Sequence, residues 1–162
     1  MPVKKSPQAS RPYMPGYGLP KGQKGLLPWT WAKQRLEKSH NYWIATSRPD
    51  GSPHLMVIWG LWMDGAFLFS TGEKSRKGRN LAHNPRCVIG TDKSAEAVIV
   101  EGTVEVNRDE KLRKKFNRAY QKKYKWDMST FKDPVYVLRP SLGFGFYEKD
   151  FLGKATRWRF SE

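Results

Sequence analysis

The stretch FSTGEKSRKGRNLAHNPR brings hydroxyl groups and cations together where a predicted strand gives way to a predicted helix. Ser70 and Thr71 end an apolar run. Ser75, Arg76 and Lys77 follow at the expected start of the helix, where backbone amides are unpaired and carry a partial positive charge. These groups predict a cradle for an anion such as a phosphate. The alternative is that Ser75 only caps the helix and that both cations are solvated.

A second candidate site is the strand-like segment ATRWRF near the end of the chain. Alternation along a strand places Arg157 and Arg159 on one face. The other face then carries Thr156, Trp158 and Phe160. An indole beside cations suits a planar, electron-poor ring with anionic substituents. The alternative is an edge strand whose arginines are solvated and whose aromatic side chains belong to the core.

No conventional catalytic arrangement accompanies these two segments. His40, His54 and His83 are not spaced as metal ligands, and a lone histidine in a strand is more often packed than catalytic. The single cysteine, Cys87, falls in an apolar strand and is expected to behave as a small hydrophobic residue. Neither a Walker loop nor a GxGxxG motif is present. The sequence therefore predicts no metal site and identifies no catalytic residue, and any redox chemistry is expected to come from a cofactor.

The chain has 162 residues and a formal net charge of +15 at pH 7. This charge predicts attraction to an anionic partner, and both nucleic acid and a phosphorylated or polycarboxylate cofactor satisfy it. No apolar run approaches the ~20 residues that a membrane helix needs. The first residues also lack the apolar segment of a secretory signal. We therefore expect a cytoplasmic protein with no membrane association.

The chain divides into a tail and one domain. Residues 1–28 are rich in Pro, Gly, Lys and Arg and contain no acidic residue, which predicts a basic, irregular tail. Residues 29–162 alternate apolar runs with turn signals, of which Asp50-Gly51 and Asp64-Gly65 are the clearest. Many short strands with few helices are typical of a mainly β protein built as a small antiparallel barrel. The expected helices cover residues 30–39, 75–82 and 109–125, and the expected strands cover residues 41–47, 53–63 (mostly buried), 66–71, 86–91, 97–106, 135–138 leading into 143–147, and 156–160.

Taken in order, the segments RPDGSPHLMVIW, DGAFLFSTGEKSRKGRNLAHNPR, AVIVEGTVEV and TRWRF resemble the pyridoxamine 5′-phosphate oxidase-like flavin-binding proteins. The resemblance covers roughly residues 29–160 and implies a split β-barrel. It also implies a homodimer that binds FMN, or the deazaflavin coenzyme F420, in a cleft between the subunits.

The resemblance also suggests roles for individual residues. Arg76 and Lys77 match the pair that binds the cofactor phosphate, and Asn80 lies one helical turn beyond Arg76. Trp158, or its neighbour Arg157, matches aromatic and arginine contacts to the flavin. With the hydroxyl residues of the cradle, the candidate cofactor-binding residues are Ser70, Thr71, Ser75, Arg76, Lys77, Asn80, Arg157 and Trp158.

The departures from the family pattern limit the function. True pyridoxamine phosphate oxidases carry an Arg and a Lys on the central strand and a Gln before the next Glu-Gly, and these positions here hold Leu55, Gly60 and Ala97. The resemblance therefore implies a different flavin- or deazaflavin-dependent oxidoreductase, which transfers hydride to or from an unidentified small molecule. The Ser-Arg-Lys cradle favours FMN, whereas the net charge also suits the polyglutamate tail of coenzyme F420.

Two other functions stay open. A small basic barrel can bind single-stranded nucleic acid by stacking bases on exposed aromatic side chains. Most aromatic residues here lie in apolar runs typical of a core, which weakens this alternative. The chain could also bind a cofactor without turnover, as a carrier, a sensor or a sequestering protein.

Overall fold

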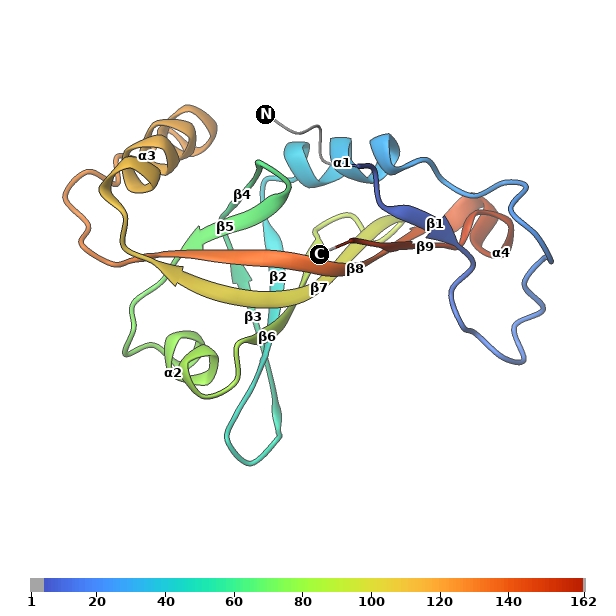
Figure 1. Ribbon diagram of the computed structural model, residues 1–162, viewed down its shortest axis with the longest axis horizontal. Coiled ribbons are helices and arrows are strands. Elements are labelled where there is room, and N and C mark those ends of the chain that lie inside the picture. The colour runs from blue at the N-terminus through green and yellow to red at the C-terminus, as the bar shows by residue number, and fades with distance from the viewer. Residues whose placement is uncertain (1–4, 162) are drawn as a thin grey trace.

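The computed structural model describes residues 5–161, so the first four residues of the predicted tail lie outside the described part. Within residues 5–161, nine antiparallel strands form a split β-barrel, with helices around it (Figure 1). The strand order is β1-β9-β8-β7-β6-β2-β3, and β5, which also carries β4, pairs with β8. The elements are β1 (Gln8–Ser10), α1 (Trp29–Lys38), β2 (Tyr42–Ser47), β3 (Pro53–Ile58), β4 (Leu61–Met63), β5 (Ala66–Ser70), α2 (Arg76–His83), β6 (Arg86–Thr91), β7 (Glu96–Asn107), α3 (Glu110–Tyr124), β8 (Val135–Tyr147), the 3-10 helix η1 (Glu148–Asp150), α4 (Phe151–Lys154) and β9 (Thr156–Arg159).

Strand β8 is the longest strand and organises the sheet. One edge of β8 pairs with β7 from end to end. The other edge is divided, because its first four residues pair with β5 and residues Leu142–Gly145 pair with β9. The register shifts between Glu101 and Gly102 of β7, where Ser141 of β8 is the extra residue of a bulge. The two runs expected at 135–138 and 143–147 are therefore one continuous strand.

The strand expected at residues 53–63 is in fact two strands, β3 and β4, separated at Trp59 and Gly60. A Cβ atom on Gly60 would lie 2.2 Å from Cζ of Phe67, so only glycine allows the chain to pass β5 this closely. β3 pairs with β2 at the edge of the sheet and is mostly exposed, which corrects the expectation of a mostly buried strand. The strands on either side of this break form two separate hairpins, β2–β3 and β4–β5.

Both predicted hairpin turns are confirmed. Asp64 and Gly65 have φ angles of 54° and 74°, as the tight turn between β4 and β5 requires. In the turn between β2 and β3, Gly51 has a φ of 85°, and the Ser52 amide donates to Oδ1 of Asp50 at 2.9 Å. The three expected helices are present as α1, α2 and α3, and α4 was not predicted. No helix within residues 5–161 is long and apolar enough to span a membrane.

Part of the basic tail is ordered, which corrects the expectation of a wholly irregular segment. β1 pairs antiparallel with β9, at the far end of the chain. The Arg11 guanidinium donates to the carbonyl oxygens of Gly153 at 2.8 Å and Ala155 at 3.1 Å. It also donates to two carbonyl oxygens of the loop that follows β1. The division of the chain between residues 28 and 29 stays a prediction.

Two apolar clusters fill the interior. The larger lies between the sheet and α1, which contributes the fully buried Ala32 and Leu36. The smaller lies between α3 and the β4–β5 hairpin with the start of β8. Fully buried aromatic residues are Tyr42, Phe67, Phe69, Phe116 and Trp158.

Side chains from the second half of α3 form hydrogen bonds with Gly60, where the strand is interrupted. The Tyr124 hydroxyl donates to the Gly60 carbonyl at 2.8 Å and accepts from the Gly60 amide at 3.0 Å, and the Tyr124 ring stacks on Trp59. Lys123 Nζ donates to the Gly60 carbonyl at 3.1 Å and to the Tyr42 hydroxyl at 2.7 Å. Burial lowers the pKa of Lys123 to about 8 and raises the pKa of Tyr124. These side chains replace the backbone partners that Gly60 loses where the strand breaks.

We expect Tyr124→Phe to destabilise the protein by about 1–3 kcal/mol, because the buried amide and carbonyl of Gly60 both lose a partner. The free energy of unfolding in urea measures the effect. Tyr17→Phe is the matched control, because the Tyr17 side chain is exposed. Equal stability of the two variants would show that the hydroxyl of Tyr124 is dispensable at the strand break.

Candidate functional site

The predicted anion cradle is built around the first turn of α2. Ser75 is the N-cap, and its hydroxyl accepts from the Gly78 amide at 3.0 Å. The loop before it wraps over this turn, because the Ser75 amide donates to the Gly72 carbonyl at 3.0 Å. Gly78 is needed for this packing, since a Cβ atom there would lie 2.5 Å from the Gly72 carbonyl oxygen. Ser75 therefore caps the helix, as the simpler interpretation of the sequence proposed, and the cap also fixes the loop.

The strand-end hydroxyls point to different places. Oγ1 of Thr71 lies 3.2 Å from Oγ of Ser75, so these two hydroxyls meet at the start of α2. Ser70 instead donates to the Pro134 carbonyl at 3.1 Å, at the start of β8. The structure thus brings Thr71 and Ser75 together and uses Ser70 to join β5 to the segment before β8.

Arg76 and Lys77 supply positive charge at the same helix end. Their amides occupy the first turn, where no intrahelical acceptor exists. Arg76 is exposed, whereas Lys77 is partly buried, and this burial lowers the pKa of its amino group. Two cationic residues, two unpaired amides and the positive end of the helix dipole therefore belong to the same turn, which favours an anion there.

Asn80 lies beneath this turn and is fully buried. Its Nδ2 donates to Oγ1 of Thr46 on β2 at 3.0 Å, and its Oδ1 has no hydrogen-bond partner. A buried polar atom without a partner costs free energy, so this oxygen is an unsatisfied acceptor beneath the first turn of α2. Sequence reasoning missed Thr46, although strand alternation places it on the buried face with Tyr42 and Ile44.

His54 also belongs to this region, although the sequence analysis treated it as a packed strand histidine. It stands opposite Thr46 in the β2–β3 ladder, so both side chains lie on one face. Its Nδ1 atom is buried and has no partner. Partial burial lowers the pKa of the His54 imidazole, and the nearby cations Arg48, Lys77 and Arg76 lower it further.

Arg157 and Trp158 lie elsewhere in the chain. Trp158 pairs with Gly143 of β8, whereas Ser70 pairs with Val135, and eight residues of strand correspond to roughly 26 Å. Figure 1 shows α2 near the start of β8 and β9 toward its other end. Trp158 is fully buried and packs edge-on against Trp29, so its predicted contact with a cofactor finds no support in this placement. Arg157 donates to the Ser10 hydroxyl on β1 at 3.1 Å.

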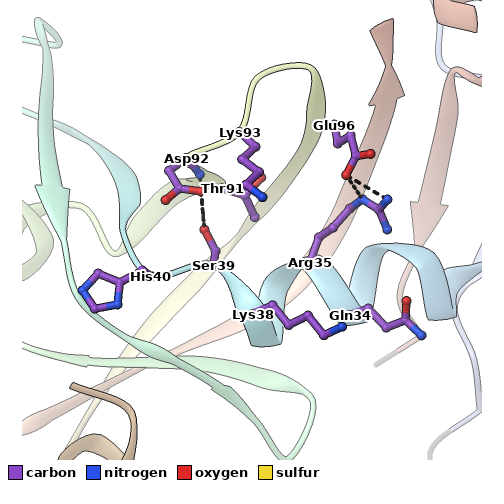
Figure 2. A pocket seen from close by; sticks show the side chains of 9 residues that line it. All are labelled: Gln34, Arg35, Lys38, Ser39, His40, Thr91, Asp92, Lys93 and Glu96. Atoms are coloured by element: carbon purple, nitrogen blue, oxygen red, sulfur yellow. Dashed lines mark hydrogen bonds and ion pairs between the residues drawn. The ribbon is translucent and has the colours of Figure 1, made fainter. Parts of the chain in front are cut away.

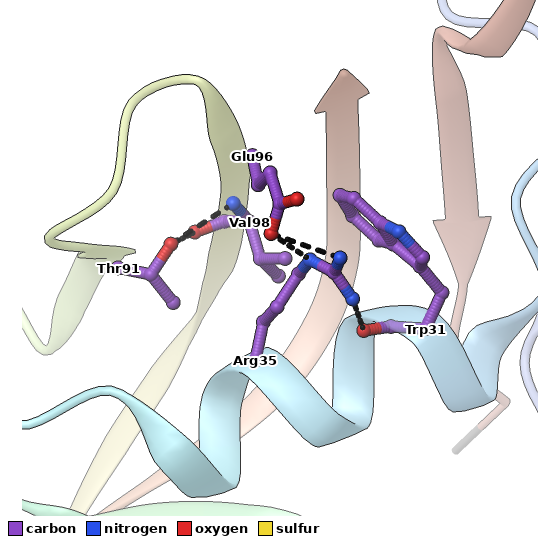
Figure 3. Close-up of polar contacts among 5 residues, drawn as sticks. All are labelled: Trp31, Arg35, Thr91, Glu96 and Val98. Atoms are coloured by element: carbon purple, nitrogen blue, oxygen red, sulfur yellow. Dashed lines mark hydrogen bonds and ion pairs between the residues drawn. The ribbon is translucent and has the colours of Figure 1, made fainter.

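A polar hollow of about 380 Å³ lies between the end of α1 and the β6–β7 turn (Figure 2). Its polar groups mostly satisfy one another. Arg35 donates to Glu96 and to the Trp31 carbonyl, and its guanidinium stacks on the Trp31 ring at 3.7 Å (Figure 3). Thr91 accepts from the Val98 amide at 3.1 Å, where the β6–β7 ladder ends. These contacts hold α1 to the sheet, so this hollow is a weaker candidate than the α2 cradle.

A second hollow of about 550 Å³ lies on the outer face of β2, β6 and β7 and reaches Asn84, at the C-terminal end of α2. Neither hollow includes Arg76 or Lys77.

A family model described as pyridoxamine 5′-phosphate oxidase matches residues 31–141, more than half of the chain. The chain belongs to this family. The match includes α2 and the β2–β3 hairpin but not β9, so it covers the cradle and leaves out Arg157 and Trp158. No protein with a curated description matches the chain significantly.

Solved structures with a similar fold support the assignment to this family. An F420 reductase is 25% identical, with a TM-score of 0.57, over 68% of this chain and 94% of its own. A conserved hypothetical protein from Mycobacterium tuberculosis is 19% identical, with a TM-score of 0.68, over 80% of this chain and 91% of its own. A heme binding protein from Mycobacterium smegmatis is 22% identical, with a TM-score of 0.60, over 74% of this chain and 54% of its own. The split β-barrel fold is therefore confirmed, and family members with this fold differ in the ligand they are named for.

We expect Gly78→Ala to destabilise the protein by about 1–3 kcal/mol, because the new methyl group would overlap the carbonyl oxygens of Gly72 and Glu73. Thermal or urea unfolding measures the loss. Gly72→Ala is the matched control, since a Cβ atom at that position meets nothing within 4 Å. If both variants were as stable as the parent, the close packing of the loop on α2 would be wrong.

Proposed function

We propose that this protein is a cytoplasmic flavin- or deazaflavin-dependent oxidoreductase that holds the phosphate of FMN, or of coenzyme F420, at the N-terminus of α2. The observation that carries the proposal is the placement of Arg76 and Lys77, with their unpaired amides, in the first turn of α2, which Ser75 caps. Membership of the pyridoxamine 5′-phosphate oxidase family supports it.

The residues present fit a phosphate ester with a polyol chain. The amides and cations of Arg76 and Lys77 suit the phosphate oxygens, which accept charge-assisted hydrogen bonds. The hydroxyls of Thr71 and Ser75 lie beside them and can exchange hydrogen bonds with the phosphate or with hydroxyls next to it. The unpartnered Oδ1 of the buried Asn80 is an acceptor that a ligand hydroxyl can satisfy.

A bound flavin or deazaflavin would supply the hydride-transfer chemistry. The protein's own part is to fix the phosphate end, so that the ring lies in one position relative to a substrate. No catalytic side chain is assigned among residues 5–161. In this arrangement, specificity for the substrate would depend on the side chains around the cofactor ring rather than on a catalytic side chain.

FMN and coenzyme F420 remain the two candidate cofactors, and different observations favour them. The cradle serves one phosphate and suits FMN, which we place first. The F420 reductase, at 25% identity over 94% of its own chain, favours the deazaflavin. The net charge of +15 also complements a polyglutamate tail.

We expect Arg76→Ala/Lys77→Ala to weaken FMN binding by about 2–4 kcal/mol, or roughly 30- to 1,000-fold, because two charge-assisted contacts to the phosphate are lost. Quenching of flavin fluorescence during titration measures the affinity, and coenzyme F420 is titrated in parallel. Lys111→Ala/Lys114→Ala on α3 is the matched control, because it removes the same charge from exposed positions on another helix. Unchanged affinity in the cradle variant would refute the site.

The proposal also includes a homodimer, and the exposed edge strand supports it. Leu55, Met56 and Val57 of β3 and Trp43 of β2 are 41–59% exposed, and they adjoin one another in the ladder. A long apolar edge strand left open to water invites pairing or aggregation, so such a strip is typical of an interface. A second chain bound to this strip would cover the hollow beside β2 and bring residues of that chain toward the cradle.

We expect Val57→Asp to shift the protein toward monomers, because a carboxylate in an apolar interface loses its hydration. Light scattering during size-exclusion chromatography measures the mass. Val106→Asp on β7 is the matched control, since the two valines are 52% and 50% exposed. A parent protein that is already monomeric would contradict the dimer, whatever the variants do.

A further inference from the structure

The burial of the His54 side chain is not explained by the pairing of β2 with β3 or by packing in the apolar core. On the edge strand β3 its neighbours Leu55, Met56 and Val57 are apolar and exposed, whereas the Nδ1 atom of His54 is buried and unpartnered. The β2–β3 register sets His54 across from Thr46, whose hydroxyl accepts from Asn80 of α2. The imidazole therefore lies on the side of the sheet that α2 covers.

The charges of three cations, from the β2–β3 turn and from α2, act on this imidazole. Arg48 comes from the turn between β2 and β3, and its Nη1 is anchored on the Pro53 carbonyl at 2.7 Å. Arg76 and Lys77 come from the first turn of α2. Partial burial and these cations lower the pKa of His54, so they disfavour the imidazolium when no anion is present.

We propose that His54 is a further ligand of the anion site and takes up a proton when a dianionic phosphate group binds beside Arg76 and Lys77. The inference rests on the proposed function, because the anion is the phosphate assigned to the α2 cradle. A neutral imidazole presents an unpartnered nitrogen, whereas an imidazolium donates from both nitrogens.

The charges around His54 determine whether anion binding raises or lowers its affinity for a proton. In the empty site, protonation would add a fourth positive charge beside Arg48, Arg76 and Lys77, which is unfavourable. A dianion between these groups reverses the local field and favours the imidazolium. Because coupling is reciprocal, each tenfold gain in proton affinity on anion binding equals a tenfold gain in anion affinity on protonation. Anion affinity should therefore rise as the pH falls through the range in which His54 titrates.

Inorganic sulfate is the probe, because its charge does not change over the pH range of interest, whereas the second pKa of a phosphate ester is about 6. Calorimetry measures sulfate affinity between about pH 5.5 and about pH 8 for the parent protein, His54→Gln and His54→Asn. His83→Gln is the control, since His83 is exposed at the end of α2. In the parent protein, NMR follows the C2–H resonance of His54 with and without sulfate.

We expect sulfate to bind several-fold to about tenfold more tightly at the acidic end, with the slope lost in both His54 variants and kept in His83→Gln. The His54 resonance should titrate at higher pH when sulfate is bound. A slope that persists in both His54 variants, or a His54 titration that sulfate does not move, would overturn the inference while leaving the cradle intact. Sulfate and FMN binding that are both indifferent to Arg76→Ala/Lys77→Ala would overturn the cradle and this inference together.

Discussion

A β-strand offers two edges for hydrogen bonding, and β8 gives one to β7 and divides the other between β5 and β9. This division sets the distance between β5, which leads to α2, and β9, which pairs with β1. β5 leads directly into the loop and helix of the cradle, whereas β9 lies beside the N-terminal strand at the other end of β8. The two segments that sequence reasoning joined in one cofactor site are therefore held apart within a single chain by the ladder itself.

The sequence predicted most elements of this fold because their signals are local. Asp-Gly turns specify φ angles that few other pairs tolerate, and the periodicity of α3 is visible within 15 residues. The break at Gly60 was missed because its cause is not local: Phe67 leaves no room for a side chain, and Tyr124, 64 residues away, supplies the lost hydrogen bonds. The strand β1 was missed for a similar reason, since its partner lies at the other end of the chain.

In the candidate site too, some residues can be recognised from the local sequence, whereas others depend on contacts with distant segments. Ser75, Arg76 and Lys77 were identifiable because a helix N-terminus carries its own signature in five residues. Thr46 and His54 were not, since their approach to α2 depends on the register of one hairpin and on the packing of a helix against it. The cofactor contact of Trp158 stays a prediction, and the burial of its side chain depends on distant residues. A tryptophan between two arginines looks like a ligand contact in sequence, but burial between Trp29 and the glycines of β8 makes it part of the core.

The pairing of β1 with β9 carries a consequence for how the chain reaches its final form. Arg157 and Ser10, which touch in the folded protein, are 147 residues apart in sequence. Within residues 5–161, β1 pairs with β9 and with no other strand, so β1 can join the sheet only when β9 is present. Joining segments this far apart carries a large loop-closure entropy, which the core contacts of Trp158 and the hydrogen bonds of Arg11 must offset. β1 also covers β9, which would otherwise be an open edge of the sheet that invites pairing with another chain.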